Sequence, residues 1–206
     1  MPKTNPILLR LTEALTTQKM PKTNPILLRL TEAFEASAKE FSTENGRLSR
    51  LSEVMATQAL EPRHALLDHI WVDFKADSGV VASVEPVPSE GCRIQLMDRG
   101  TSPWFSFSYI LSVEALRSSR FLGLLIRGRA EGVAAFRPCL RYLLPDGFKD
   151  SFARNVILLE PDAEDQISFI RTDPQLVNEA VGAEVLFFFE GVNFDVTLSN
   201  VENLNI

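Results

Sequence analysis

Four arginines in the second half of the chain stand at strand-like spacings, on the parity opposite to apolar side chains. Arg127 and Arg129 follow a run of alternating aliphatic residues and occupy the other parity. Arg137 and Arg141 share one parity of the next segment. A guanidinium group is a planar fork of hydrogen-bond donors that suits carboxylates, sulfates, phosphates and neighbouring hydroxyl groups. If the two segments pair as a hairpin, four such groups converge on one face of a sheet.

A structural alternative exists for these arginines. Residues 121–129 and 133–143 are predicted to be consecutive strands, and aspartate or glutamate side chains on adjacent strands could pair with the arginines. An exposed ion pair of this kind contributes about 0–1 kcal/mol. The sequence alone leaves both interpretations open.

Two tryptophans are candidates for contact with a sugar ring. Trp104 shares the polar parity of its predicted strand with two serines, and Trp71 shares a parity with Asp73. An exposed indole can stack on the axial C–H groups of a sugar. The alternative is that each indole caps the edge of the core. The predicted ligand-binding set is Trp71, Trp104, Arg127, Arg129, Arg137 and Arg141.

Neither a catalytic nor a metal-binding motif stands out. His64 and His69 are five residues apart, which fits neither one helical face nor one strand face. The acidic residues are too scattered to define the carboxylate pair of a glycosidase, so no catalytic residue and no enzyme activity are predicted. The acidic stretch 160–165 could bind calcium or could be a solvated loop. Cys92 and Cys139 could pair or remain buried thiols.

Composition limits the other partners. The 206 residues are 45% hydrophobic and include 14 Phe, which is enough for a substantial core. The net charge of −6 argues against non-specific nucleic-acid binding. No apolar run approaches the roughly 18 residues of a membrane span, and Arg10 interrupts the first apolar run too early for a signal peptide. We therefore expect no membrane partner and, by default, a cytoplasmic location.

The N-terminus contains an exact duplication. Residues 1–14 recur without change at residues 20–33. A structural repeat normally diverges and recurs more than twice, so this pair is typical of a recent duplication or an artefact. We predict that residues 1–19 are dispensable for folding.

A helical pattern follows Pro25 for some thirty residues and ends at Glu61-Pro62. Apolar side chains recur every seventh position, at Leu27, Phe34, Phe41, Leu48 and Met55. One interpretation is an amphipathic helix that packs on the following domain. The other is a short coiled coil that makes the protein a dimer or trimer. Both give a helical segment over residues 1–60 and a second domain over residues 61–206.

From residue 65 onward the hydrophobic period changes from 3.6 to 2, with turn residues between eight to ten short segments. This pattern predicts a mainly β domain built as an antiparallel sandwich. Its most apolar block, residues 183–198, is predicted to be two strands around a tight turn, buried in the middle of the sandwich. Residues 173–182 are predicted to hold a helical turn.

The order of these segments resembles a known architecture. An aromatic strand near Trp104, the arginine-bearing strands, the turn region at residues 148–152 and the closing strand at residues 194–198 are similar to the jelly-roll sandwiches of carbohydrate-binding modules and galactose-binding-like domains. The resemblance covers residues 65–206. It implies a ligand on the concave sheet face or at the loop end. Many such proteins carry a structural calcium, although no residues of this chain match its ligands; no other cofactor is expected.

The leading prediction is a non-catalytic, lectin-like carbohydrate-binding or adhesion module, with an acidic polysaccharide among its expected ligands. A homo-oligomer would raise a weak sugar affinity through avidity. The alternative is a structural subunit, such as a spike, fibre or accessory protein, whose sandwich binds another protein.

Overall fold

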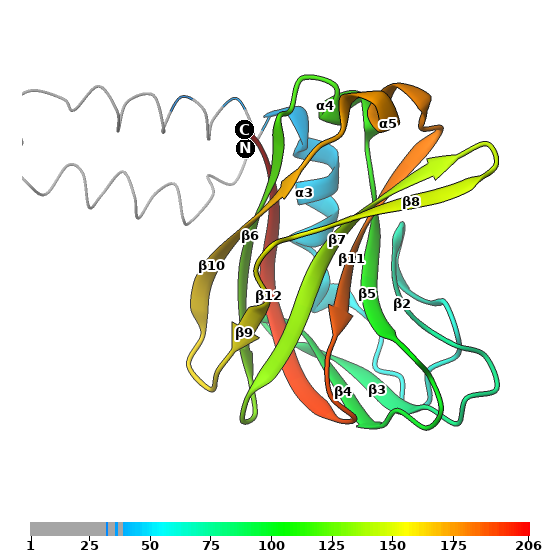
Figure 1. Cartoon of the computed structure of the whole chain (residues 1–206). Coiled ribbons are helices and arrows are strands. Elements are labelled where there is room, and N and C mark those ends of the chain that lie inside the picture. Colours follow the sequence, from blue (N-terminus) through cyan, green and yellow to red (C-terminus); the bar gives the residue numbers. More distant parts are fainter. Residues whose placement is uncertain (1–31, 33–35, 37–38) are drawn as a thin grey trace, which may run out of the picture.

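The chain folds as a β-sandwich of two antiparallel sheets, as the alternating pattern predicts (Figure 1). The computed structural model describes Glu32, Ala36 and residues 39–206. Within this part of the chain, no helix is long and apolar enough to cross a membrane.

The larger sheet has seven strands. In spatial order these are β1 (His64–Leu67), β2 (Ile70–Phe74), β5 (Phe105–Leu111), β11 (Gly182–Phe189), β7 (Ala134–Leu144) and β8 (Gly147–Phe152), with β9 (Ile157–Leu159) also paired to β7. The hairpin between β7 and β8 turns at Pro145-Asp146, and Gly147 follows with a positive φ of 149° that favours glycine. Strand β8 is therefore an edge of the larger sheet.

The smaller sheet has five strands. In spatial order these are β10 (Glu164–Arg171), β6 (Phe121–Ala130), β12 (Phe194–Asn205), β4 (Gly91–Asp98) and β3 (Val81–Val87). The short helix α4 (Val113–Leu116) precedes β6, and α5 (Pro174–Glu179) follows β10, where a helical turn was predicted. Strand β10 forms one edge of this sheet.

Phenylalanine side chains fill the space between the sheets. Phe105 stacks in parallel on Phe74 and meets Phe189 and Phe194 edge-on. Phe187 stacks on Phe136 with ring centroids 4.8 Å apart. These rings come from both sheets, so aromatic packing across the interface holds the layers together.

The apolar block 183–198 is buried as predicted, but its two strands do not form a hairpin. Strand β11 is central in the larger sheet and β12 is central in the smaller one. The connection at Gly191, whose φ is 83°, crosses from one layer to the other. The parity prediction is confirmed, because Val185, Phe187 and Phe189 on β11 face Phe194, Val196 and Leu198 on β12 across the core.

The predicted thirty-residue helix is wrong at its C-terminal end. Helix α3 (Ser42–Leu48) is followed by a 3₁₀ turn, η1 (Leu51–Glu53). Met55 is then exposed, and Thr57 pairs with Val84 of β3 as an isolated β-bridge. The edge of the smaller sheet thus captures a segment that the heptad spacing alone assigned to a helix.

Two positions of the predicted coiled-coil seam belong to the core of this chain. Phe41 and Leu48 are buried among the sandwich side chains, before the predicted domain boundary at residue 60. Neither is available to a partner helix. Leu27, Phe34 and residues 1–14 lie outside the described residues, so a homo-oligomer formed through that region stays a prediction.

A buried polar cluster fixes α3 to both sheets. The side-chain Oδ1 of Asn45 accepts hydrogen bonds from the backbone N–H and the side-chain Nδ2 of Asn203, at 2.8 and 2.9 Å. The hydroxyl of Tyr109 donates to Oδ1 of Asn203 at 2.8 Å. Burial raises the pKa of Tyr109 well above its ordinary value, so this hydroxyl stays protonated. The cluster joins α3, β12 and β5.

Candidate functional site

The four predicted arginines do not converge on one face. Strand β6, with Arg127 and Arg129, pairs with β10 and β12, whereas β7, with Arg137 and Arg141, pairs with β11, β8 and β9. The expected hairpin is wrong because the connection through Gly132, whose φ is 94°, leads from one sheet to the other. The two arginine pairs therefore lie in separate layers.

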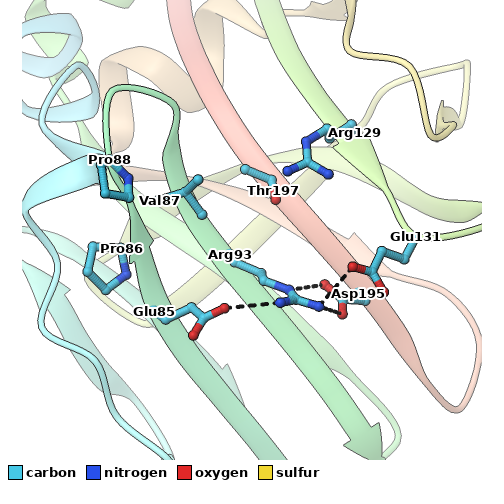
Figure 2. Close-up of a pocket in the computed structure, with 9 residues that line it drawn as sticks. All are labelled: Glu85, Pro86, Val87, Pro88, Arg93, Arg129, Glu131, Asp195 and Thr197. Atoms are coloured by element: carbon cyan, nitrogen blue, oxygen red, sulfur yellow. Dashed lines mark hydrogen bonds and ion pairs between the residues drawn. The ribbon is translucent and has the colours of Figure 1, made fainter.

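A hollow of about 290 Å³ lies on the outer face of the smaller sheet (Figure 2). We call it the Arg93 hollow; its polar lining is Glu85, Arg93, Arg129, Glu131, Asp195 and Thr197. The side chains come from β3, β4, β6 and β12 and from the turn after β6. Strand alternation turns these polar residues outward while their apolar neighbours face the core.

Arg93 is at the centre of this hollow. Its Nε donates to Oδ1 of Asp195 at 2.7 Å, and one terminal nitrogen donates to the other oxygen of the same carboxylate. The guanidinium group also contacts Glu85 at 3.1 Å and Glu131 at 3.0 Å, as the dashed lines in Figure 2 show. Gln95 donates to Asp195 at 3.1 Å. The hydrogen bond to Asp195 raises the pKa of Arg93, so its charge is permanent and its orientation is fixed.

The Arg93 hollow has more negatively than positively charged side chains. Arg93 and Arg129 stand against the carboxylates of Glu85, Glu131 and Asp195. The guanidinium donors already have carboxylate partners, so an anionic ligand would have to compete with three fixed negative charges. The hollow is chemically suited to hydroxyl groups, which can both accept from a guanidinium and donate to a carboxylate.

The other predicted arginines of the smaller sheet are also paired. Arg127 contacts Asp165 on the neighbouring strand β10 at 3.3 Å. Arg129 contacts Glu90, in the turn between β3 and β4, at 3.3 Å. Both pairs are partly exposed and contribute little to stability. Of the two interpretations made from the sequence, pairing with acidic side chains therefore describes Arg127 and Arg129.

On the larger sheet, Arg141 forms a bidentate pair with Asp150 of β8, with both distances at 2.8 Å. Its guanidinium carbon also lies 4.0 Å from the ring centroid of Phe148. Hydrogen bonding to Asp150 raises the pKa of Arg141. Arg137 is exposed and has no hydrogen bond or ion pair with any described residue.

The two tryptophans lie apart from the Arg93 hollow. Trp71 is only 7% exposed on the outer face of the larger sheet, and the guanidinium carbon of Arg63 lies 4.9 Å from its ring centroid. Little of that indole remains for stacking on a sugar. Trp104 is half-buried immediately before β5, and its carbonyl accepts the hydroxyl of Ser102 at 2.6 Å.

Glu184 is a largely buried carboxylate on the outer face of the larger sheet. Burial raises its pKa, while the charges of Arg63 and Arg141 act in the opposite direction. The distance from Arg63 to Glu184 is 3.6 Å. Its environment penalises the negative charge more than these cations favour it.

A second depression, of about 1050 Å³, lies where the edge strands β8 and β10 approach each other. We call it the edge groove; its cationic and aromatic lining is Arg120, Phe121, Phe152, Arg154, Phe169 and Arg171. None of these residues belongs to the ligand-binding set predicted from the sequence. They come from the ends of three strands and from a loop, and only the tertiary fold brings them together.

The expectations for metals and cysteines can be stated for the described part of the chain. In the described part of the chain, no group of three or more His, Cys, Asp or Glu residues could hold a metal ion, and this applies to residues 160–165 as well. The structural calcium that the resemblance implies stays a prediction. Cys92 and Cys139 are free and buried in different sheets. Burial raises the pKa of each thiol to about 12, so neither is a reactive thiolate.

Comparison with known proteins supports the architecture. No family model and no curated protein sequence matches the chain. The solved carbohydrate-binding module CBM4 aligns with 77% of this chain and 99% of its own length, at 14% identity and a TM-score of 0.52. A family 11 carbohydrate-binding module from Clostridium thermocellum aligns with 74% of this chain and 96% of its own length, at 14% identity and a TM-score of 0.45. The predicted resemblance to the sandwich of carbohydrate-binding modules is therefore confirmed for the fold.

Proposed function

We propose that this protein is a non-catalytic carbohydrate-binding module that binds sugar hydroxyl groups in the Arg93 hollow. The observation that carries the proposal is the fixed array around Arg93, in which donors and acceptors from adjacent strands are held in one orientation. Such preorganised groups lose little freedom when a polar ligand binds. The fold of CBM4 supports the class of ligand.

The charge of the hollow specifies the ligand further. Because the carboxylates of Glu85, Glu131 and Asp195 outnumber the two guanidinium groups, we propose a neutral sugar at this position. The acidic glycan expected from the sequence needs a cationic surface elsewhere on the module.

Binding to a panel of neutral polysaccharides in affinity gels tests this function. The variant Glu85→Gln/Glu131→Gln removes two negative charges, replaces one acceptor oxygen of each carboxylate by an NH2 donor, and leaves the Arg93–Asp195 pair intact. We expect its affinity to fall about tenfold, the equivalent of about 1.4 kcal/mol. Glu114→Gln, which changes an exposed carboxylate paired with Arg117, is the matched control.

Two results would contradict the Arg93 hollow as the binding site. One is a wild-type protein that shows no saturable binding to any neutral polysaccharide. The other is a double variant that binds as tightly as the control. Either result would remove the main support for sugar binding at this face.

The second candidate is an interaction subunit of a larger assembly. It is favoured by the apolar side chains exposed on the edge strand β8, Phe148 and Phe152. This candidate would be favoured if the protein bound none of the polysaccharides in the panel and a defined partner co-purified with it at fixed stoichiometry. Light scattering on the full chain would also test the predicted homo-oligomer, which a monomer at micromolar concentration would exclude.

A further inference from the structure

Three arginines border the edge groove, and none has an acidic partner among the described residues. Arg120 immediately precedes β6, Arg154 lies in the loop between β8 and β9, and Arg171 ends β10. All three are exposed. Within the described part of the chain, their side chains take part in no hydrogen bond or ion pair. Each guanidinium group therefore keeps its full set of donors for a ligand.

One acidic side chain lines the groove. Asp173 is the sole acidic residue in the described lining, and its Oδ1 accepts the backbone N–H groups of Gln175 and Leu176. This carboxylate caps helix α5 and is directed toward the helix backbone. Three cationic side chains thus stand against one acidic side chain in this lining, on a chain whose net charge is −6.

Aromatic rings accompany these cations. Phe152 and Phe169 are 49% and 46% exposed, although most phenylalanines of this chain are buried in the core. They come from the two edge strands, β8 and β10. Phe121, which is half-buried, lies beside Arg120, with 6.0 Å between the guanidinium carbon and the ring centroid. Exposed ring faces next to cations suit a ligand that has both C–H surfaces and negative groups.

A buried hydroxyl also lines the groove without a partner. Ser168 is 1% exposed, and its Oγ has no hydrogen bond among the described residues. Buried polar atoms are nearly always paired, so an orphaned hydroxyl beside a groove is consistent with a polar ligand. This observation is independent of the arginines.

We propose that the edge groove binds an anionic oligosaccharide, through its carboxylates or sulfates at Arg120, Arg154 and Arg171 and through its ring faces at Phe152 and Phe169. The proposal rests on the function proposed above, because it takes the ligand to be a sugar. Arginine pairs in a bidentate manner with both anions. The negative charge of the whole chain disfavours a long polyanion such as nucleic acid, since repulsion grows beyond the groove.

Calorimetric titration of the full chain with three oligosaccharides tests the proposal. The probes are an oligogalacturonate, a sulfated oligosaccharide and a neutral β-glucan oligosaccharide. The first two distinguish carboxylate from sulfate, and binding of either one supports the groove. The variant Arg120→Gln/Arg154→Gln/Arg171→Gln should lose at least about a hundredfold in affinity for the acidic probe, at about tenfold for each strongly engaged arginine. Binding of the neutral probe should not change.

The matched control has the same change in charge away from the groove. Arg47→Gln/Arg50→Gln/Arg117→Gln removes three arginines of the α3, η1 and α4 region and should bind the acidic probe like the wild type. Phe169→Ala should weaken acidic binding about fivefold, and Phe148→Ala, on the same edge strand as Phe152 but outside the groove, should not.

The possible outcomes separate this proposal from the previous one. Acidic binding that is absent in the wild type, or equal in the groove variant and the control, overturns the edge groove whatever the neutral probe does. Acidic binding that depends on the three arginines supports the groove even if neutral binding is absent, a result that counts against the Arg93 hollow alone. Duplex DNA or an acidic peptide that competes equally at the same arginines overturns the assignment to a sugar.

Discussion

The Arg93 hollow and the edge groove use the same residue type in opposite ways. The guanidinium group of Arg93 pairs with three carboxylates, two from the neighbouring strands β3 and β12 and one from the turn after β6. Arg120, Arg154 and Arg171 stand at strand ends and loops, where no described carboxylate reaches them. The strands beside Arg93 supply carboxylates, whereas Arg137, which also lies inside a sheet, has no partner among the described residues. The difference teaches that nearby acidic side chains, and not the residue type alone, decide whether the donors of an arginine are occupied.

The largest expected effect on stability is at Arg93. The change Arg93→Ala leaves the mostly buried carboxylate of Asp195 without its bidentate partner. We expect the free energy of unfolding to fall by about 2 kcal/mol, as for a charged hydrogen bond that is lost at a partly buried site. Urea denaturation followed by tryptophan fluorescence measures the loss. A variant as stable as the wild type would mean that the carboxylates do not depend on this arginine.

A smaller loss is expected at Arg141. Its bidentate pair with Asp150 is about one-fifth exposed, so solvent screens the interaction only in part. Arg141→Ala should lower the free energy of unfolding by about 1 kcal/mol, including the lost contact with Phe148. Arg137→Ala, on the same strand but without a described partner, is the control. Equal losses in the two variants would show that pairing does not distinguish these arginines.

The third prediction concerns the pH dependence of stability at Glu184. The cations Arg63 and Arg141 only partly offset the unfavourable burial of its carboxylate. Because burial raises its pKa, the folded chain holds the proton more tightly than the unfolded chain does. The resulting stabilisation is present below the ordinary pKa of 4.5 and is lost as the pH rises through the folded value. Glu184→Gln cannot ionise, so it should become more stable relative to the wild type as the pH rises. Denaturation curves at a series of pH values should show this divergence; parallel pH profiles would contradict it.

The smallest effect on stability is expected in the edge groove. Because its three arginines have no described partners, Arg120→Gln/Arg154→Gln/Arg171→Gln should change the free energy of unfolding by less than about 0.5 kcal/mol. The same urea experiment measures it. A loss as large as that of Arg93→Ala would mean that these arginines are structural, and the contrast between the two regions would disappear.

Local pattern was sufficient to predict the sandwich and its inward faces. Val185, Phe187 and Phe189 alternate strictly, because one face of β11 packs on the core. Alternation is a property of single strands, so it does not specify which strands pair. Gly132 and Gly191 look like hairpin turns in the sequence, yet each lies in a connection between sheets. The predicted arginine face failed for this reason.

Within the heptad at residues 27–55, Phe41 and Leu48 agree with the first interpretation, an amphipathic segment that packs on the following domain, and the coiled coil stays a prediction. Phe41 and Leu48 are apolar because they pack on the sandwich, and an amphipathic helix gives the same spacing whether it packs on its own chain or on a partner. The edge groove could not be predicted at all. Arg120, Arg154 and Arg171 are separated by strands and loops, and no spacing rule relates them.

The central place of β12 has a consequence for how the chain is synthesised. This last strand lies between β6 and β4, and it also carries Asn203, which holds the helix residue Asn45 across 158 positions of sequence. Until residue 205 has left the ribosome, the smaller sheet lacks its middle strand and α3 lacks the hydrogen bonds between Asn45 and Asn203. The sandwich can therefore close only after translation has passed this strand, and until then its exposed strand edges are open to chaperones and to aggregation.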